Sequence, residues 1–169
     1  MKFVVDLPLG GLAKWLRFCG LDTTTQSLSP ADPGSLPVPA PDTYLLTGQA
    51  AFQRLHRQDV LILTGAGPEA QLDEVLSRLN LSRRHLDPLS RCVRCNDPLV
   101  PRPREQVQGL VPDHVFFSQK EFHQCPRCHR LYWPGSHLST IQQKLEQALR
   151  HPEGRQASRP AGKEVSPET

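Results

Sequence analysis

Residues 60–79 read VLILTGAGPEAQLDEVLSRL. The first five residues are an apolar run of strand length, and a glycine-rich turn follows them. Pro68 comes next, where proline favours the first turn of a helix. Apolar side chains then recur at three- and four-residue spacing as far as Leu79. The stretch therefore predicts a buried strand, Val60–Thr64, followed by a helix from Pro68 to about Leu79.

The same pattern occurs twice more towards the N-terminus. Lys2–Val5 and Tyr44–Thr47 are short apolar runs that predict two further buried strands. The first of them precedes a helical face that includes Cys19 and ends at Gly20. The second precedes a short predicted helix, Ala50–Arg57. Strands that alternate with helices predict an α/β fold with a parallel sheet flanked by helices. Cys19 is interpreted as a core thiol, with a reactive thiol as the alternative.

Four of the five cysteines form two Cys-x-x-Cys pairs, Cys92 with Cys95 and Cys125 with Cys128. Each pair can chelate one metal ion, because the two intervening residues turn the chain back on itself. Four thiolates complete a tetrahedral shell without an open position, which is typical of structural zinc. Disulfides or free thiols are the alternative. The separation of the pairs exceeds the usual ribbon spacing, and we attribute it to an inserted loop, residues 100–122.

These patterns divide the chain into four predicted parts. Residues 1–88 form the α/β domain, and residues 29–41 form a proline-rich loop within it, since five prolines there exclude a helix or a central strand. Residues 89–137 form a zinc ribbon. A helix follows at 138–150, with Leu138, Ile141, Leu145 and Leu149 on one stripe. Residues 151–169 are polar and predicted to be disordered.

Charge is distributed unevenly along the chain. Residues 1–82 carry six Lys or Arg and eight Asp or Glu, whereas residues 83–130 carry nine and five. The basic middle indicates a polyanionic partner, and a solvated surface is the alternative. The N-terminus has no apolar segment typical of a signal peptide, and no stretch has the apolar length of a membrane span. We therefore expect an intracellular protein, cytoplasmic or, in a eukaryote, nuclear, with no membrane association.

Three stretches carry a resemblance to a known family. They are DLPLGGLAKWLR at residues 6–17 with Gly20, Asp22 and Thr23 after it, SRCVRCN at 90–96, and FHQCPRC at 122–128 leading into YWPGSH at 132–137. The chain resembles the PIN-like ribonuclease domain at the C-terminus of the Mut-seven exonuclease proteins, which also occurs as a free-standing prokaryotic protein. The resemblance implies a PIN-like fold, a zinc ribbon after it, and a role in RNA cleavage or processing.

The resemblance also implies a metal site. PIN-type nucleases gather carboxylates at strand ends to hold Mg²⁺ or Mn²⁺. Asp6 matches the first acidic position, and capping of the following helix is the alternative role for it. Asp22 also matches a family position, and the end of a turn is its alternative role. Asp42 and Asp73 are the remaining acids, although Asp42 precedes a strand, the wrong end for the site, and Asp73 lies one turn into a helix, where it also favours the helix dipole. The family's Thr-Arg-Asp stretch reads Thr47-Gly48-Gln49 here, so one carboxylate is missing. Glutamine cannot supply the charge that a hard dication prefers.

Several side chains within and after the two cysteine pairs suit contact with nucleic acid. Arginines neutralise phosphates and aromatic faces stack on unpaired bases. The candidates are Arg94, Arg127, Arg130, Trp133 and His137. Packing of the ribbon is the alternative role for Trp133, and a structural hydrogen bond is the alternative for His137.

Three functions are consistent with these residues. The first is an RNA-binding domain of ribonuclease ancestry with weakened or lost cleavage, and the missing carboxylate favours it. The second is an active ribonuclease that uses Mg²⁺ or Mn²⁺. The third is a protein-interaction module that serves a partner exonuclease domain or protein. RNA is the expected partner in the first two.

Overall fold

The computed structural model describes residues 1–135. The predicted helix at 138–150, the predicted tail at 151–169 and His137 lie outside the described residues. The helices and strands are, in order, β1 Lys2–Asp6, α1 Gly10–Phe18, β2 Asp22–Gln26, β3 Thr43–Thr47, β4 Val60–Ile62, α2 Pro68–Arg78, β5 Val100–Arg102, α3 Asp113–Ser118, β6 Phe122–Gln124 and β7 Leu131–Tyr132. Short 3-10 helices lie between them, including η1 Leu7–Leu9, η3 Ala50–Leu55 and η5 Arg104–Gln106.

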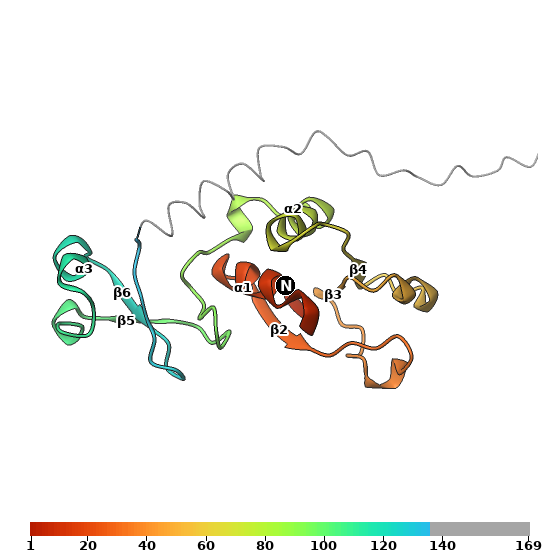
Figure 1. Cartoon of the computed structure of the whole chain (residues 1–169), viewed down its shortest axis with the longest axis horizontal. Coiled ribbons are helices and arrows are strands. Elements are labelled where there is room, and N and C mark those ends of the chain that lie inside the picture. The colour runs from red at the N-terminus through yellow and green to blue at the C-terminus, as the bar shows by residue number, and fades with distance from the viewer. Residues whose placement is uncertain (136–169) are drawn as a thin grey trace, which may run out of the picture.

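The N-terminal half contains a parallel sheet with the strand order β2-β1-β3-β4, which confirms the predicted α/β class (Figure 1). Lys2 pairs with Asp22 at one end of β1, and Asp6 pairs with Gln26 at the other. The sequence predicted three strands for this half, and β2 was missed. It has the sequence DTTTQ and lies at the edge of the sheet, so it has no apolar run that would reveal it.

Two apolar clusters cover opposite faces of this sheet. Phe3, Val5 and Leu46 face α1 and α2, whose leucines complete the larger cluster. Leu45 and Phe52 belong to the second cluster, in which η3 and the segment after β2 cover the other face. The predicted helix at 50–57 is therefore a shorter 3-10 helix, which ends where His56 adopts a positive φ of 48°.

The second half of the described chain forms a smaller antiparallel sheet, β5-β6-β7, beside the first one (Figure 1). Residues 100–122, expected to be a loop, contain β5, η5 and α3. Val107, Val111, Val115 and Phe122 form a cluster of their own, and Trp133 packs against it. We call residues 89–135, which include both cysteine pairs, the cysteine module. The insertion therefore gives the cysteine module an apolar core, which small metal-bound modules often lack.

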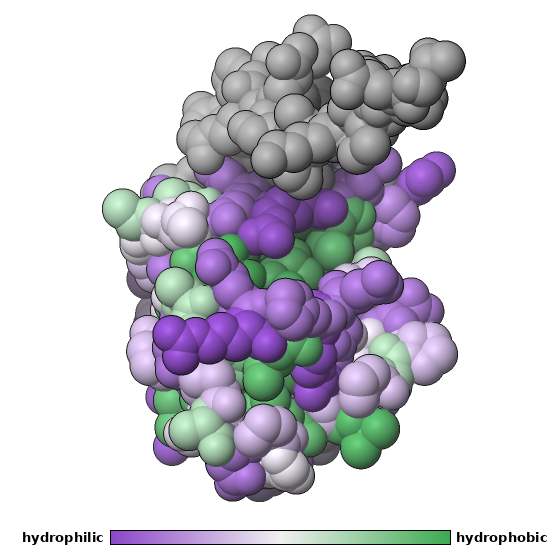
Figure 2. Space-filling view, turned by 90° about the vertical axis from the view of Figure 1, so that its right-hand side faces the viewer, coloured by the Kyte–Doolittle hydropathy of each residue, from purple (hydrophilic) through white to green (hydrophobic). Residues whose placement is uncertain are grey.

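One face of the molecule is mixed in polarity rather than dominated by one apolar area. Figure 2 shows the face that lies at the right of Figure 1, where polar residues divide the apolar ones into separate areas. Among residues 1–135, no helix has the length and apolar character that a membrane span requires.

Candidate functional site

Asp6 ends β1 and is buried, with 2% of its surface exposed. Three donors converge on its carboxylate. The Leu28 backbone N–H donates to Oδ1 at 3.2 Å, the Thr47 hydroxyl donates to Oδ2 at 2.9 Å, and the Gln49 side-chain amide donates to Oδ2 at 2.8 Å. The same amide nitrogen also donates to the Leu28 carbonyl at 3.0 Å. A buried charge requires such partners, and here all of them come from the protein itself.

The alternative role of Asp6 as a helix cap is wrong. Asp6 stands at the start of η1, but its side chain makes no capping hydrogen bond. Its carboxylate instead joins the ends of β1 and β3 through Thr47, because parallel strands end at the same edge of the sheet. Asp6 therefore occupies the edge where ligands bind in such sheets, and both its oxygens are already engaged.

Two of the other candidate carboxylates, Asp22 and Asp42, lie at the opposite end of the sheet from Asp6. Asp22 begins β2 and pairs with Lys2, at the opposite end of the sheet. Its carboxylate accepts a hydrogen bond from the Asn96 side chain at 2.7 Å and lies 3.5 Å from the Arg91 guanidinium. Asp42 precedes β3, at that same far end, and Asp73 lies in α2. The pairing of Asp6 with Asp22 in one site is therefore not found.

The four paired cysteines do come together. Their sulfur atoms all lie within 4.8 Å of one another, and the Sγ atoms of Cys92 and Cys128 are 3.7 Å apart. A tetrahedral zinc site with Zn–S bonds of about 2.3 Å places its sulfurs about 3.8 Å apart. A disulfide would need about 2.05 Å. The cluster therefore fits a shared metal ion, and within residues 1–135 it is the one group of three or more potential ligands close enough to hold one.

The two cysteine pairs have the same backbone geometry. The Cys95 N–H points at Cys92 Sγ and the Cys128 N–H at Cys125 Sγ, at 3.3 and 3.5 Å. The residue after each pair has a positive φ, 68° at Asn96 and 58° at His129, and its N–H bonds back to the first cysteine carbonyl. Each pair is therefore a tight turn that directs both sulfurs to one point.

Local hydrogen bonds set the acidity of these thiols. Burial raises the pKa of Cys92, but hydrogen bonds from the Tyr132 hydroxyl and from nearby backbone N–H groups outweigh burial and bring its pKa to about 7. The Tyr132 oxygen lies 3.1 Å from Cys92 Sγ. Burial raises the pKa of Cys125, and hydrogen bonds from backbone N–H groups do not offset it. The thiolate form is therefore favoured more at Cys92 than at Cys125.

The first cysteine pair is anchored to the α/β domain by Arg17 of α1. Its Nε donates to the Thr23 carbonyl at 2.8 Å, and its Nη1 donates to the carbonyls of Val93 and Arg94 at 3.1 and 3.2 Å. Asn96 completes the contact, because its side-chain oxygen accepts the Thr23 N–H at 2.9 Å. The cysteine module is therefore hydrogen-bonded to β2.

A family comparison agrees with this combination of sheet and cysteine cluster. The model described as the Mut7-C RNAse domain matches residues 1–145, a range that includes Asp6 and all four clustered cysteines. The chain belongs to the Mut7-C RNAse domain family. Comparisons with curated proteins and with solved structures gave no match.

The predicted nucleic-acid residues of this Mut7-C RNAse domain lie at different places. Arg94 and Arg127 lie near β2, on the first and second cysteine pairs, and both line one pocket. Arg130 is exposed after the second pair and does not line that pocket. Trp133 is half-buried, with its ring 6.5 Å from the ring of Phe122, so it packs against the module's core.

Sequence reasoning missed two side chains that organise the site. Arg17 and Asn96 both belong to the stretches that carried the family resemblance, but neither was assigned a role. An arginine on the helix and an asparagine just after a cysteine pair gave no signal that both would bond to Thr23, because Arg17 and Asn96 lie 79 positions apart in the sequence. Only the docking of the module on β2 brings them together.

Proposed function

We propose that this chain is an RNA-binding domain of ribonuclease ancestry with a PIN-like fold, in which metal-dependent RNA cleavage is weakened or lost. Membership of the Mut7-C RNAse domain family supports the ribonuclease ancestry. The hydrogen bond from Gln49 to Asp6 is the observation that supports weakened or lost cleavage.

The surroundings of Asp6 do not fit a catalytic dication. Mg²⁺ and Mn²⁺ require several oxygen ligands, and in nucleases these are chiefly carboxylates. Both Asp6 oxygens already accept hydrogen bonds from protein donors, and an amide donor lies where a second carboxylate would be needed. Within residues 1–135, no group of three or more His, Cys, Asp or Glu surrounds Asp6 closely enough to hold an ion.

Zinc is the metal we propose for the four cysteines, in a structural role. Four thiolates leave no open position for water or substrate, so the ion would hold the module together rather than perform chemistry. Metal analysis of the reduced protein is expected to find about one zinc per chain. Much less than that would contradict the assignment.

The function is tested with end-labelled single-stranded RNA and the full chain. We expect binding that weakens steeply as salt increases, because phosphate contacts release counterions. We expect no cleavage beyond background in Mg²⁺ or Mn²⁺. Metal-dependent cleavage that disappears in Asp6→Asn, with the variant shown to be folded, would establish the active ribonuclease instead.

The same RNA-binding experiment distinguishes the third function, a protein-interaction module, from the two RNA-directed functions. A protein-interaction module for an exonuclease has no need to bind RNA. Absence of salt-dependent RNA binding by the zinc-loaded chain would therefore overturn the proposal and leave the protein-docking function.

A further inference from the structure

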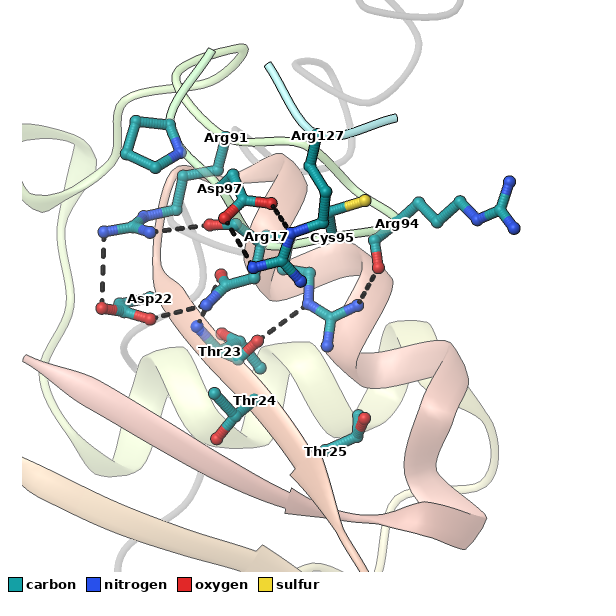
Figure 3. A pocket seen from close by; sticks show the side chains of 12 residues that line it. Arg17, Asp22, Thr23, Thr24, Thr25, Arg91, Arg94, Cys95, Asp97 and Arg127 are labelled. Atoms are coloured by element: carbon teal, nitrogen blue, oxygen red, sulfur yellow. Dashed lines mark hydrogen bonds and ion pairs between the residues drawn. The ribbon is translucent and has the colours of Figure 1, made fainter. Parts of the chain in front are cut away.

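A pocket of about 540 Å³ lies between β2 and the two cysteine pairs. Thr23, Thr24 and Thr25 of β2 line one side (Figure 3). The first cysteine pair and its neighbours line the other side, and Arg127 reaches in from the second pair. The pocket follows the outer edge of β2, whereas Asp6 lies at the end of the neighbouring strand β1.

Arg17 supplies a buried positive charge at the base of this pocket. It is only 9% exposed, and three carbonyl oxygens accept hydrogen bonds from its Nε and Nη1. Within the described residues, no carboxylate lies at ion-pair distance from it. Figure 3 shows its remaining nitrogen directed to the side where Thr24 and Thr25 lie. The guanidinium is therefore held rigidly, with one nitrogen left to face a ligand.

The edge of β2 supplies further donors. Asn96 and Arg17 take up the N–H and C=O of Thr23, which point away from β1. Because backbone direction alternates along a strand, the N–H of Thr25 points to the same outer side. The side chains of Thr24 and Thr25 are both exposed but lie on opposite faces of the strand, and the Thr24 hydroxyl donates to the Phe3 carbonyl at 3.4 Å. Hydroxyl and backbone N–H donors beside a guanidinium are the groups that commonly bind phosphate oxygens.

Most of the charges around the pocket are matched by opposite charges. Its lining contains four arginines, two aspartates and Cys95, which belongs to the cysteine cluster. Arg91 lies against Asp22, and Arg127 forms a two-pronged contact with Asp97 at 2.9 and 3.1 Å. The carboxylates are thus matched by these two arginines, whereas Arg17 and the exposed Arg94 at the rim have no carboxylate partner among the ion pairs of the described residues.

We propose that this pocket binds a backbone phosphate of single-stranded RNA, with Arg17, Arg94 and the Thr25 N–H as its donors. The proposal rests on the proposed function, because it identifies where the RNA is held. Gln26, the next residue of β2, pairs with Asp6. A strand held at Thr25 would therefore extend along the sheet edge towards the ancestral cleavage site.

The test measures the affinity of the zinc-loaded full chain for a labelled single-stranded RNA at several salt concentrations. Arg94→Gln is expected to weaken binding about three- to tenfold and to reduce the salt slope by about 1, as loss of one phosphate contact predicts. Arg54→Gln is the matched control, since Arg54 is also exposed but does not line the pocket. We expect it to change neither quantity appreciably. If the two variants change RNA affinity equally, the pocket is not the phosphate site, although the chain still binds RNA.

A second measurement does not depend on substitution. In ¹H–¹⁵N spectra, the RNA is expected to shift the signals of the Thr25 backbone amide and the Arg17 Nε–H. Non-specific attraction between RNA and a basic surface would not shift these two signals in particular. RNA binding without these shifts would also overturn the proposal. So would a polyglutamate peptide that competes as well as RNA, because it would show a general acidic-peptide surface. Failure of the wild type to bind RNA would remove the proposed function and this inference together.

Discussion

The side-chain amide of Gln49 donates a hydrogen bond of 2.8 Å to Oδ2 of Asp6, at the edge of the sheet where β1 and β3 end. A second carboxylate at this position would repel Asp6 unless a cation lay between them. An amide removes the repulsion and needs no cation. Under the function proposed above, Gln49 and Asp6 thus form a polar cluster that needs no divalent metal.

Restoring a carboxylate at this position should restore the need for a cation. Gln49→Glu has nearly the same shape as the wild type but places two carboxylates in contact. We expect it to lose about 1–3 kcal/mol of stability without metal, since a charge-assisted hydrogen bond is replaced by repulsion. Millimolar Mn²⁺ should recover part of this loss in thermal melts. Gln53→Glu, an exposed control on η3, should change little in either condition. A fully stable Gln49→Glu without metal would contradict the contact.

Asp6→Asn should itself be destabilising. Donors approach both oxygens of Asp6, so the amide group of asparagine must place its NH₂ against at least one of them. An unsatisfied buried group costs about 1–3 kcal/mol, which chemical denaturation can measure. Asp42→Asn is the control, because Asp42 is exposed and asparagine tolerates its positive φ of 58°. If both variants are equally stable, the three hydrogen bonds to Asp6 do not require its negative charge.

Metal removal should unfold the cysteine module selectively. Binding free energy of a structural metal acts as folding free energy, and the module's apolar core is small. With a strong chelator, we expect hydrogen exchange to accelerate at residues 91–99 and 122–132, while β1 and β3 retain protection. Cys19→Ala should behave as the wild type does, since Cys19 is not in the cluster. Loss of protection throughout the chain would show that the α/β domain cannot fold without the module.

The burial of each strand explains why the sequence predicted some strands of the sheet and missed another. β1, β3 and β4 are apolar because the sheet is covered on both faces, and all three were recognised. The edge strand β2 has the sequence DTTTQ, with four of its five residues at least partly exposed, so only its threonines hinted at a strand. With β2 unseen, the sequence had no means to place Asp22 at the far end of the sheet from Asp6.

The cysteine cluster was predictable because its chemistry is local to each pair, whereas its surroundings were not. Two Cys-x-x-Cys turns indicate a metal site wherever they lie. The core around Val107, Val115 and Phe122 depends on residues brought together by β5, α3 and β6. Likewise, the pocket depends on the docking of Asn96 against Thr23, a contact between distant parts of the chain. Spacing within a single stretch carries no information about such contacts.

Cys19 should resist thiol reagents even after the metal is removed. It is fully buried, and burial raises its pKa to about 12. Because a raised thiol pKa favours the protonated form, the reactive thiolate forms only as pH approaches that value, and at pH 8 its fraction is negligible. Mass spectrometry after alkylation with a chelator present should therefore find four modified cysteines, and a fifth only in denaturant. Modification of Cys19 at the rate of the others would show that the α1 face opens freely.

Gly20→Ala should disturb the connection between α1 and the cysteine module more than its backbone conformation alone predicts. Gly20 has a φ of 84°, and a Cβ there would lie 2.3 Å from the Asp87 carbonyl oxygen and 2.6 Å from Ser90 Oγ. Gly67 also has a positive φ, 94°, but a Cβ there meets nothing within 4 Å. The two alanine variants therefore share a conformational cost of about 1–2 kcal/mol, and only Gly20→Ala adds a collision with backbone.

Urea denaturation should accordingly show a larger loss for Gly20→Ala than for Gly67→Ala. The displaced segment leads directly into the first cysteine pair, and Asp87 N–H bonds to the Cys19 carbonyl at 2.9 Å. We therefore also expect Gly20→Ala, but not Gly67→Ala, to accelerate hydrogen exchange at Thr23, whose N–H is held by Asn96. If the two variants lose equal stability and hydrogen exchange at Thr23 is unchanged, residues 87–90 move away from position 20 without cost. The cysteine module is then not held on β2 through this close approach.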